Sequence, residues 1–198
     1  INANANFSTT ANSISNKVTY DEKTGGQTSR PENINGNWNA GGNVMWSSAI
    51  DSLGYFSYNV SLNDNFNNRV SYITQNGESV KNVTKQNMIG SRLGLSFRND
   101  WVEVELNGSL NYNHTKNELQ PQSNLDTWTY AYGFNTTLTM PWGTQIATDM
   151  GMNSRRGYSD ASMNTNELIW NAQLSQGFLQ GKPLTVSLQV YDILPQQS

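Results

Sequence analysis

The chain has 198 residues, of which 35% are hydrophobic and only 14% charged, and its formal net charge is −3. Disordered chains are poor in aromatic residues, so 6 Trp, 9 Tyr and 6 Phe exclude simple disorder. The Lys and Arg residues are scattered, which excludes a basic patch for nucleic acid, and the lack of cysteine excludes a disulfide framework and a thiolate metal site.

No stretch approaches the roughly 20 consecutive apolar residues that a transmembrane helix needs. A strand of a transmembrane β-barrel shows lipid only every second side chain, so a barrel stays possible. The first residues also lack the basic start and apolar centre of a signal peptide. We therefore expect the native protein to begin upstream of this sequence.

Apolar and polar residues alternate with a period of two along most of the chain, which is typical of strands with two different faces. The alternation predicts nine strands, over residues 2–20, 37–48, 55–73, 86–98, 101–115, 125–140, 144–155, 164–178 and 183–194. The connections are alternately short and long, and the long ones are the polar segments 21–36, 74–85, 116–124 and 156–162. In outer-membrane barrels the short turns are periplasmic and the long loops extracellular.

The alternation is clear in the second strand, where Trp38 and Val44 face one way and Asn39 and Asn43 the other. The third strand begins in the same manner but is polar on both faces in its farther half, towards Ile73. A strand segment with no apolar face has nothing to offer to lipid. We therefore expect that farther half to lie above the membrane.

The fourth and fifth strands form the clearest predicted hairpin. Asn99 and Asp100 stand between them and fit a two-residue turn, because Asn and Asp tolerate a positive φ better than most residues. After the turn, Val102 and Leu106 alternate with Glu103 and other polar residues.

Large aromatic residues flank each predicted short turn. Amphipathic rings are favoured at the boundary between lipid and water, whereas a soluble sheet has no reason to gather them at one end of every hairpin. We predict that the membrane-interface aromatics are Trp46, Phe56, Phe97, Trp101, Trp142 and Phe178.

The opposite face of the strands is rich in Asn, Gln, Ser and Thr and suits a wet lumen. Arg92 or Arg98 could neutralise Glu103 and Glu105 across the hairpin. Alternation alone would also suit a sandwich, but predicted strands of 12–18 residues are long against the usual mode of about 5–6. The predicted lumen-facing charged residues are Arg92, Arg98, Glu103, Glu105, Asp149, Arg155 and Glu167.

These features predict an all-β fold, an antiparallel up-and-down transmembrane β-barrel of which the chain forms about nine long strands. Unpaired backbone groups are costly in hydrocarbon, so such a sheet must close. The ninth strand runs upward and a barrel chain should end on a descending one, so we expect the chain to be cut inside its last extracellular loop. A sheet made of these residues alone is expected to be open and curved, with two exposed edges.

The segment 166–198, NELIWNAQLSQGFLQGKPLTVSLQVYDILPQQS, resembles the C-terminal end of outer-membrane β-barrel proteins of the TonB-dependent receptor type. The matching features are an outward strand ending in LSQGF, a Gly-Lys turn, and LTVSLQVYDIL opening a long loop. The resemblance implies a barrel of about twenty-two strands occluded by an N-terminal plug. Residues 1–198 would then be the C-terminal portion of that barrel, with the plug and the last strand outside the chain.

The resemblance also implies a function and a location, which are import of a bulky nutrient across the bacterial outer membrane. The expected partners are outer-membrane lipid, an unknown bulky ligand, possible partner subunits, and an energy-coupling inner-membrane complex that acts through the plug. No nucleic acid, metal or cofactor is expected.

Two alternatives remain open. The first is a soluble secreted β-sheet module that binds carbohydrate through Trp and Asn. The second is a barrel enzyme that hydrolyses lipids with His114, the only histidine, which parity places toward lipid near the outer rim. No serine stands at an evident partner position, so we expect the protein not to be an enzyme.

Overall fold

A computed structural model describes residues 1–20, 24–75, 77–178 and 184–194 of the chain. These residues form eleven strands and two short 3-10 turns, η1 (Pro121–Ser123) and η2 (Ala161–Met163). None of the helices in these ranges is long and apolar enough to span a membrane. The strands are β1 (Asn2–Thr10), β2 (Ser13–Tyr20), β3 (Gln27–Ile34), β4 (Asn37–Ala49), β5 (Phe56–Gln75), β6 (Glu78–Arg98), β7 (Val102–Asn117), β8 (Leu125–Thr139), β9 (Thr144–Arg156), β10 (Asn166–Phe178) and β11 (Leu184–Val190).

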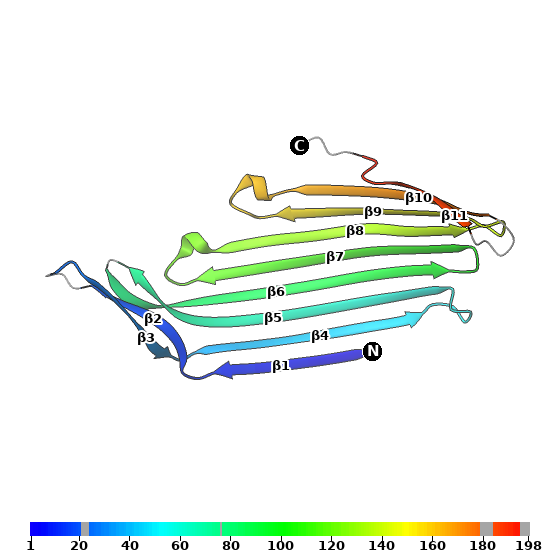
Figure 1. The fold of residues 1–198 in the computed structure, drawn as a ribbon. Coiled ribbons are helices and arrows are strands. Elements are labelled where there is room, and N and C mark those ends of the chain that lie inside the picture. Colours follow the sequence, from blue (N-terminus) through cyan, green and yellow to red (C-terminus); the bar gives the residue numbers. More distant parts are fainter. Residues whose placement is uncertain (21–23, 76, 179–183, 195–198) are drawn as a thin grey trace.

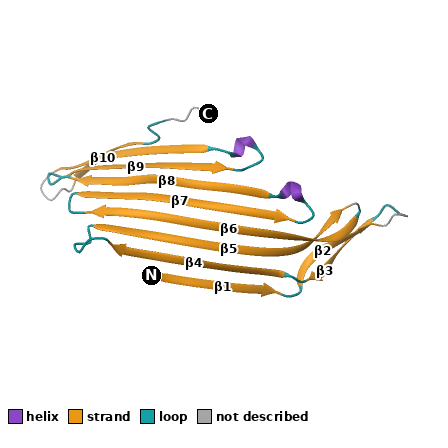
Figure 2. Ribbon diagram, turned by 180° about the vertical axis from the view of Figure 1, so that it is seen from behind, coloured by secondary structure: helices purple, strands orange, loops and turns teal. Residues whose placement is uncertain are grey.

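Nine of the strands form one antiparallel up-and-down sheet in the order β1-β4-β5-β6-β7-β8-β9-β10-β11 (Figure 1). The described sheet is open, with β1 and β11 at its edges, as expected for these residues alone. The remaining two strands, β2 and β3, form a hairpin that projects from the end of β1. From behind, the sheet is again a single layer, with both 3-10 turns at the end where the hairpin lies (Figure 2).

The strand register sorts the side chains onto two chemically different faces. Val60 pairs with Leu93 and Trp46, and one residue away Ser61 pairs with Arg92 and Met45. The apolar face includes Val44, Trp46, Val60, Leu62, Leu93, Leu95, Leu106, Leu110, Phe134, Met150, Leu174 and Leu188. The polar face includes Asn43, Asn63, Arg92, Ser96, Asn107, Ser109, Asn135, Asp149, Asn171 and Gln173.

The apolar face is not covered by any second layer of the described chain. Ile34 is the one buried hydrophobic residue in the described ranges, whereas Leu62, Leu93 and Leu106 are each about half exposed. A soluble monomer rarely leaves so large an apolar surface open to water. The face therefore requires an apolar environment from outside the chain.

The predicted first strand is in fact two strands, which is a correction. The chain turns at Asn12, whose φ of 54° lies in the left-handed region that Asn tolerates better than most residues. The Asn12 N–H donates to the side-chain oxygen of Asn35 over 2.6 Å, which holds the corner. Beyond it β2 pairs with β3, from Ser13 opposite Ile34 to Tyr20 opposite Gln27.

Two predicted long loops, 21–36 and 74–85, are also wrong in large part. Strand β3 occupies half of the first, and β6 begins at Glu78 within the second, with Gly77 at φ 82° in the turn. Both segments are polar on both faces, so no alternation of apolar residues marked them. Backbone hydrogen bonds extend the sheet there without an apolar face to mark the strands. Residues 21–23 and Asn76 lie outside the described residues.

The turn between β6 and β7 has the predicted position but not the predicted backbone. Neither Asn99 nor Asp100 has a positive φ. Instead, the Asn99 side-chain oxygen accepts hydrogen bonds from the N–H groups of Trp101 and Val102, at 2.9 and 2.8 Å. Asn99 thus closes the turn by mimicking a backbone acceptor.

The remaining strand bounds agree with prediction to within a few residues. The largest difference is in β11, which ends at Val190 instead of residue 194. The predicted turn at Gly181 and Lys182 falls outside the described ranges.

Candidate functional site

The six predicted interface aromatics all lie at the short-turn end of the sheet. Trp46, Phe56, Phe97 and Phe178 share the apolar face, and Trp101 and Trp142 stand in the turns before β7 and β9. The ring centroids of Phe56 and Phe97 are 4.6 Å apart, and Trp46 packs edge-on against Tyr58 at 5.9 Å. We call the six predicted residues the lower aromatic band.

A second band of aromatic rings crosses the apolar face near the long-loop end, and it was missed by sequence reasoning. Trp38 stacks on Phe66 at 5.0 Å and lies 6.0 Å from Phe7. Farther along the sheet, Tyr112 packs against Trp128 at 4.3 Å. We call these five residues the upper aromatic band. The spacing of aromatic residues could have revealed this band, because β4 and β5 each carry one ring of the lower band and one of the upper band on the same face.

The separation of the two bands along the strands fits the apolar belt of outer-membrane barrels. Phe56 and Phe66 lie on one face of β5, ten residues apart. At about 3.3 Å per residue, and with the tilt of about 40° that strands of outer-membrane barrels have, that separation would span about 25 Å, the height of the apolar belt in such barrels. Just beyond the upper band, the same face carries Lys85 and Lys116, which pair in register. The two lysines mark the upper boundary of the apolar belt, which also includes the charged side chain of Asp64, between Leu62 and Phe66 on β5.

His114 lies at this boundary, on the outward face that parity predicted. Its Nδ1 is 2.6 Å from the carboxylate of Asp126, which also accepts a hydrogen bond from the Tyr112 hydroxyl at 2.6 Å. Within the described residues, no serine is hydrogen-bonded to His114. The cluster therefore has a base and a carboxylate but no evident nucleophile.

The seven predicted lumen-facing charged residues all lie on the polar face, as the register of β6 to β10 places them. Two of them meet, because the guanidinium of Arg98 contacts the carboxylate of Glu103 across the β6–β7 turn. The structure therefore contains the predicted charge pair. Its partners are 68% and 37% exposed, so it is a solvated contact.

The other five predicted residues are not gathered into a cluster. The carboxylate of Asp149 accepts a hydrogen bond of 2.9 Å from Asn171 on β10. In the part of the chain that the structure describes, Arg92, Glu105 and Glu167 form no ion pair. Nor does any group of three His, Cys, Asp or Glu side chains suitable for a metal occur there.

Neutral amides dominate the centre of the polar face. Gly90 lies between Asn63 and Asn111 in one register row, and an added Cβ on this glycine would stand 2.5 Å from Asn63 Oδ1 and 2.9 Å from Asn111 Oδ1. The amides thus lie over the glycine backbone. The polar face is therefore covered here by hydrogen-bonding amide groups and carries few charges.

A pocket opens at the long-loop end, where the β2–β3 hairpin meets β4 and β5. Ser15 Oγ accepts a hydrogen bond from the N–H of Tyr72 at 3.0 Å, and Ser79 Oγ accepts one from the N–H of Val18 at 2.7 Å. These contacts fix the hairpin against β5 and β6. We call the space beneath it the rim pocket; its volume is about 420 Å³.

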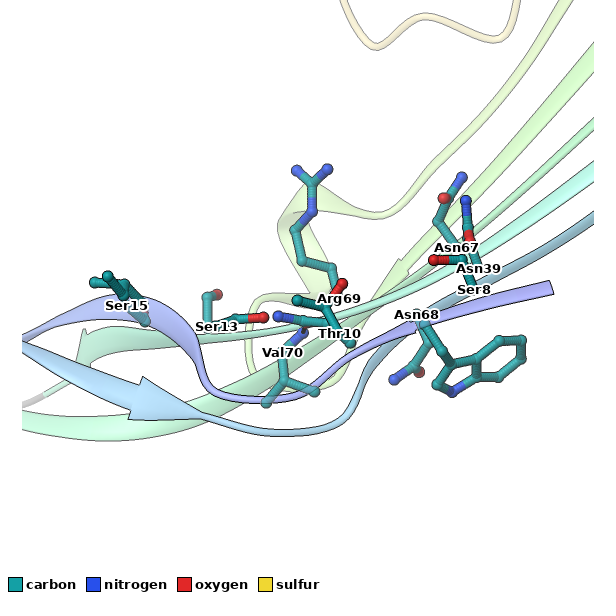
Figure 3. Close-up of a pocket in the computed structure, with 13 residues that line it drawn as sticks. Ser8, Thr10, Ser13, Ser15, Asn39, Asn67, Asn68, Arg69 and Val70 are labelled. Atoms are coloured by element: carbon teal, nitrogen blue, oxygen red, sulfur yellow. Dashed lines mark hydrogen bonds between the residues drawn. The ribbon is translucent and has the colours of Figure 1, made fainter.

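The rim pocket is lined chiefly by hydroxyl and amide groups. Ser8, Asn39 and Asn67 are register partners on β1, β4 and β5, and Arg69 follows Asn67 on the same side of β5. In Figure 3, Asn39, Asn67 and Arg69 extend from one side of the strands, whereas Asn68 and Val70 extend from the other. All lining residues lie in the described ranges, and they include one arginine and no acidic residue.

Comparison with known proteins identifies the family. Residues 51–198, well over half of the chain, match the model of the outer membrane protein beta-barrel family. No curated protein matches the chain. The solved structure of CdiB from Escherichia coli aligns over 90% of this chain and 45% of that chain, with 13% sequence identity and a TM-score of 0.34. The chain thus spans less than half of that protein, and so low a score carries no argument about function.

Proposed function

The chain belongs to the outer membrane protein beta-barrel family, and from that premise we propose that it forms part of an importer of the TonB-dependent receptor type. Its location is the bacterial outer membrane, and its sheet is a segment of an antiparallel transmembrane β-barrel. The imported substrate would be a bulky nutrient captured at the extracellular rim.

The observation that carries this proposal is the difference between the two faces of one uncovered sheet. The apolar face is bounded by two aromatic bands about 25 Å apart, while the opposite face presents Asn, Ser and Thr. A sheet of this kind can separate lipid from an aqueous lumen, because its backbone groups are paired within the ladder.

The specific role in energised import is supported by the resemblance of residues 166–198 to the end of such receptors. In the described part of that segment, β10 ends at Phe178 and β11 pairs with it in register, a hairpin that any up-and-down barrel can contain. A plug, an inner-membrane energising complex and any partner subunits would act from outside this chain.

The two alternatives have less support. A soluble carbohydrate-binding module would have to cover its apolar face, and nothing in the described chain covers it. A lipid hydrolase would need a nucleophile beside His114, whose hydrogen-bond partner is Asp126.

Cysteine labelling tests whether the apolar face of the sheet contacts lipid and the polar face contacts water. The chain has no native cysteine, so Leu95→Cys on the apolar face and Ser96→Cys on the polar face form a matched pair. In outer membranes that contain the full-length protein, a water-soluble maleimide should label the residue-96 variant and leave the residue-95 variant unlabelled until detergent is added. Equal labelling of both variants before detergent would reject a lipid-facing wall.

A second experiment tests whether the protein is coupled to TonB. The full-length protein should bind the purified periplasmic domain of the energising protein TonB, and removal of its N-terminal plug should abolish that binding. If the intact protein does not bind this domain, the TonB-dependent role is wrong even where labelling supports the wall.

A further inference from the structure

We propose that the rim pocket binds an acidic saccharide, with the Arg69 guanidinium receiving its carboxylate and the neighbouring amides and hydroxyls receiving its sugar hydroxyls. The proposal rests on the importer function and deepens it, because it names the chemical class of the ligand. Three observations support it. They are the unpaired charge of Arg69, two rows of neutral polar side chains beside it, and the β2–β3 hairpin that is fixed above them.

The guanidinium of Arg69 has no partner among the described residues. Its side chain is exposed, and within the described residues it takes part in no ion pair or side-chain hydrogen bond. Arg98, by contrast, contacts Glu103, and Arg156 donates to Asn166. A guanidinium favours planar oxyanions, which it binds through two parallel N–H donors. With no acidic residue lining the pocket, a carboxylate of the ligand is the group that complements Arg69.

Neutral groups beside Arg69 are arranged for hydroxyls. One row across the sheet holds Ser8, Asn39 and Asn67, and the next begins with Thr10 opposite Asn37. Ser8 and Asn39 form no side-chain hydrogen bond in the described structure, so their donors and acceptors are available. An amide offers both donors and an acceptor, and a hydroxyl offers both. A polyhydroxylated ligand matches such a surface, whereas an apolar peptide side chain does not.

Part of the pocket is already held in place. The Asn37 side-chain oxygen accepts the N–H of Val70 at 2.6 Å, and Asn67 donates to Asn65 at 2.6 Å. Little ordering is then required when a ligand enters, which favours binding. Trp38 belongs to the upper aromatic band and stacks on Phe66, so recognition here depends on charge and hydrogen bonds.

The test uses the purified full-length protein in detergent and two ligands with the same sugar units, trigalacturonic acid and its methyl ester, of which only the acid carries negative charge. Calorimetric titration should give at least about tenfold tighter binding of the acid, because a hydrogen bond to a charged group is worth about a tenfold change or more. Arg69→Gln should remove this preference. Arg30→Gln removes the same charge from exposed β3 outside the pocket and should leave the preference intact.

A third variant separates the sugar contacts from the charge. Asn39→Ala should weaken the acid and the ester by the same factor, about fivefold, because it removes a neutral hydrogen bond. The proposal is overturned if the acid and the ester bind alike, if neither binds, or if the Arg69 and Arg30 variants behave alike. Since titration in detergent needs no energising complex, binding of the TonB domain without binding of the acid would reject the pocket and leave the importer standing.

Discussion

At the short-turn end of the sheet, apolar and polar side chains alternate along every strand, whereas at the long-loop end neither face of β5 and β6 is continuously apolar. The first end is flanked by the lower aromatic band. The second extends beyond the upper band, and its hairpin is fixed by hydroxyl contacts such as Ser15 with Tyr72. The same ladder of backbone hydrogen bonds therefore meets two different solvents.

This difference shows what each solvent demands of a strand. In lipid a strand must satisfy its backbone and show an apolar side chain at every second position. In water the backbone ladder is sufficient, so β5 and β6 continue to Gln75 and Glu78 without any apolar face. The apolar face of each strand accordingly marks where the membrane lies.

A lysine substitution on β7 tests that boundary and should have the largest effect. Leu106 lies between the bands, so Leu106→Lys should cost about 2–4 kcal/mol of unfolding free energy, while His114→Lys at the upper boundary should cost about 0–1 kcal/mol. Urea unfolding of the full-length protein in lipid vesicles measures both. Asn107→Lys on the polar face is the control, and a loss equal to that of Leu106→Lys would mean that the faces do not differ.

A smaller loss is expected from a methyl group on the polar face in the middle of the sheet. Gly133 and Gly151 are register partners, but a Cβ on Gly133 would collide with the backbone oxygen of Met150, whereas one on Gly151 meets open space. Gly133→Ala should therefore cost about 1–3 kcal/mol and Gly151→Ala less than about 0.5 kcal/mol. The same unfolding experiment compares them, and equal losses would contradict the close approach at Gly133.

The third prediction concerns how the short turns are closed. Asn99→Ala removes the acceptor of two backbone N–H groups and should cost about 1 kcal/mol. Asn99→Asp keeps an acceptor and should recover most of that loss. Asp100→Ala is the matched control, since in the described turn its carboxylate accepts no hydrogen bond. If the two alanine variants unfold alike, the side chain of Asn99 does not hold the turn.

The membrane-facing part of the fold could be predicted from sequence because lipid imposes a residue pattern. Val102, Val104 and Leu106 opposite Glu103 and Glu105 indicated both the strand and its faces. The six residues of the predicted aromatic set stand at the short-turn end for the same reason. The upper band was missed, because Phe66 lies before one predicted long connection and Trp128 after another, and neither ring was compared with the rings of the lower band on the same face.

The rim and its pocket could not be predicted, for a physical reason. Strand β3 contains Pro31 and a single large apolar residue, Ile34, so neither propensity nor periodicity marks it. The pocket also depends on the corner at Asn12, which brings residues of β2 against β5. Contacts made by polar side chains across such distances leave no periodic signal in a single sequence.

The smallest predicted effect is a pH dependence confined to the turn before β5. Hydrogen bonds from backbone N–H groups, first that of Phe56, hold the pKa of Asp51 below its usual value of 3.8. A carboxyl whose pKa is lowered by folding stabilises the folded turn above its unfolded pKa, and that contribution is lost as the pH falls through the folded value. Below about pH 4, amide exchange protection at Phe56 should decline in the native protein and stay constant in Asp51→Asn.

The N–H of Trp101, which is held by the non-titrating amide of Asn99, provides the internal reference. A parallel decline at both amides would show that acid loosens the whole short-turn end and not the Asp51 turn in particular.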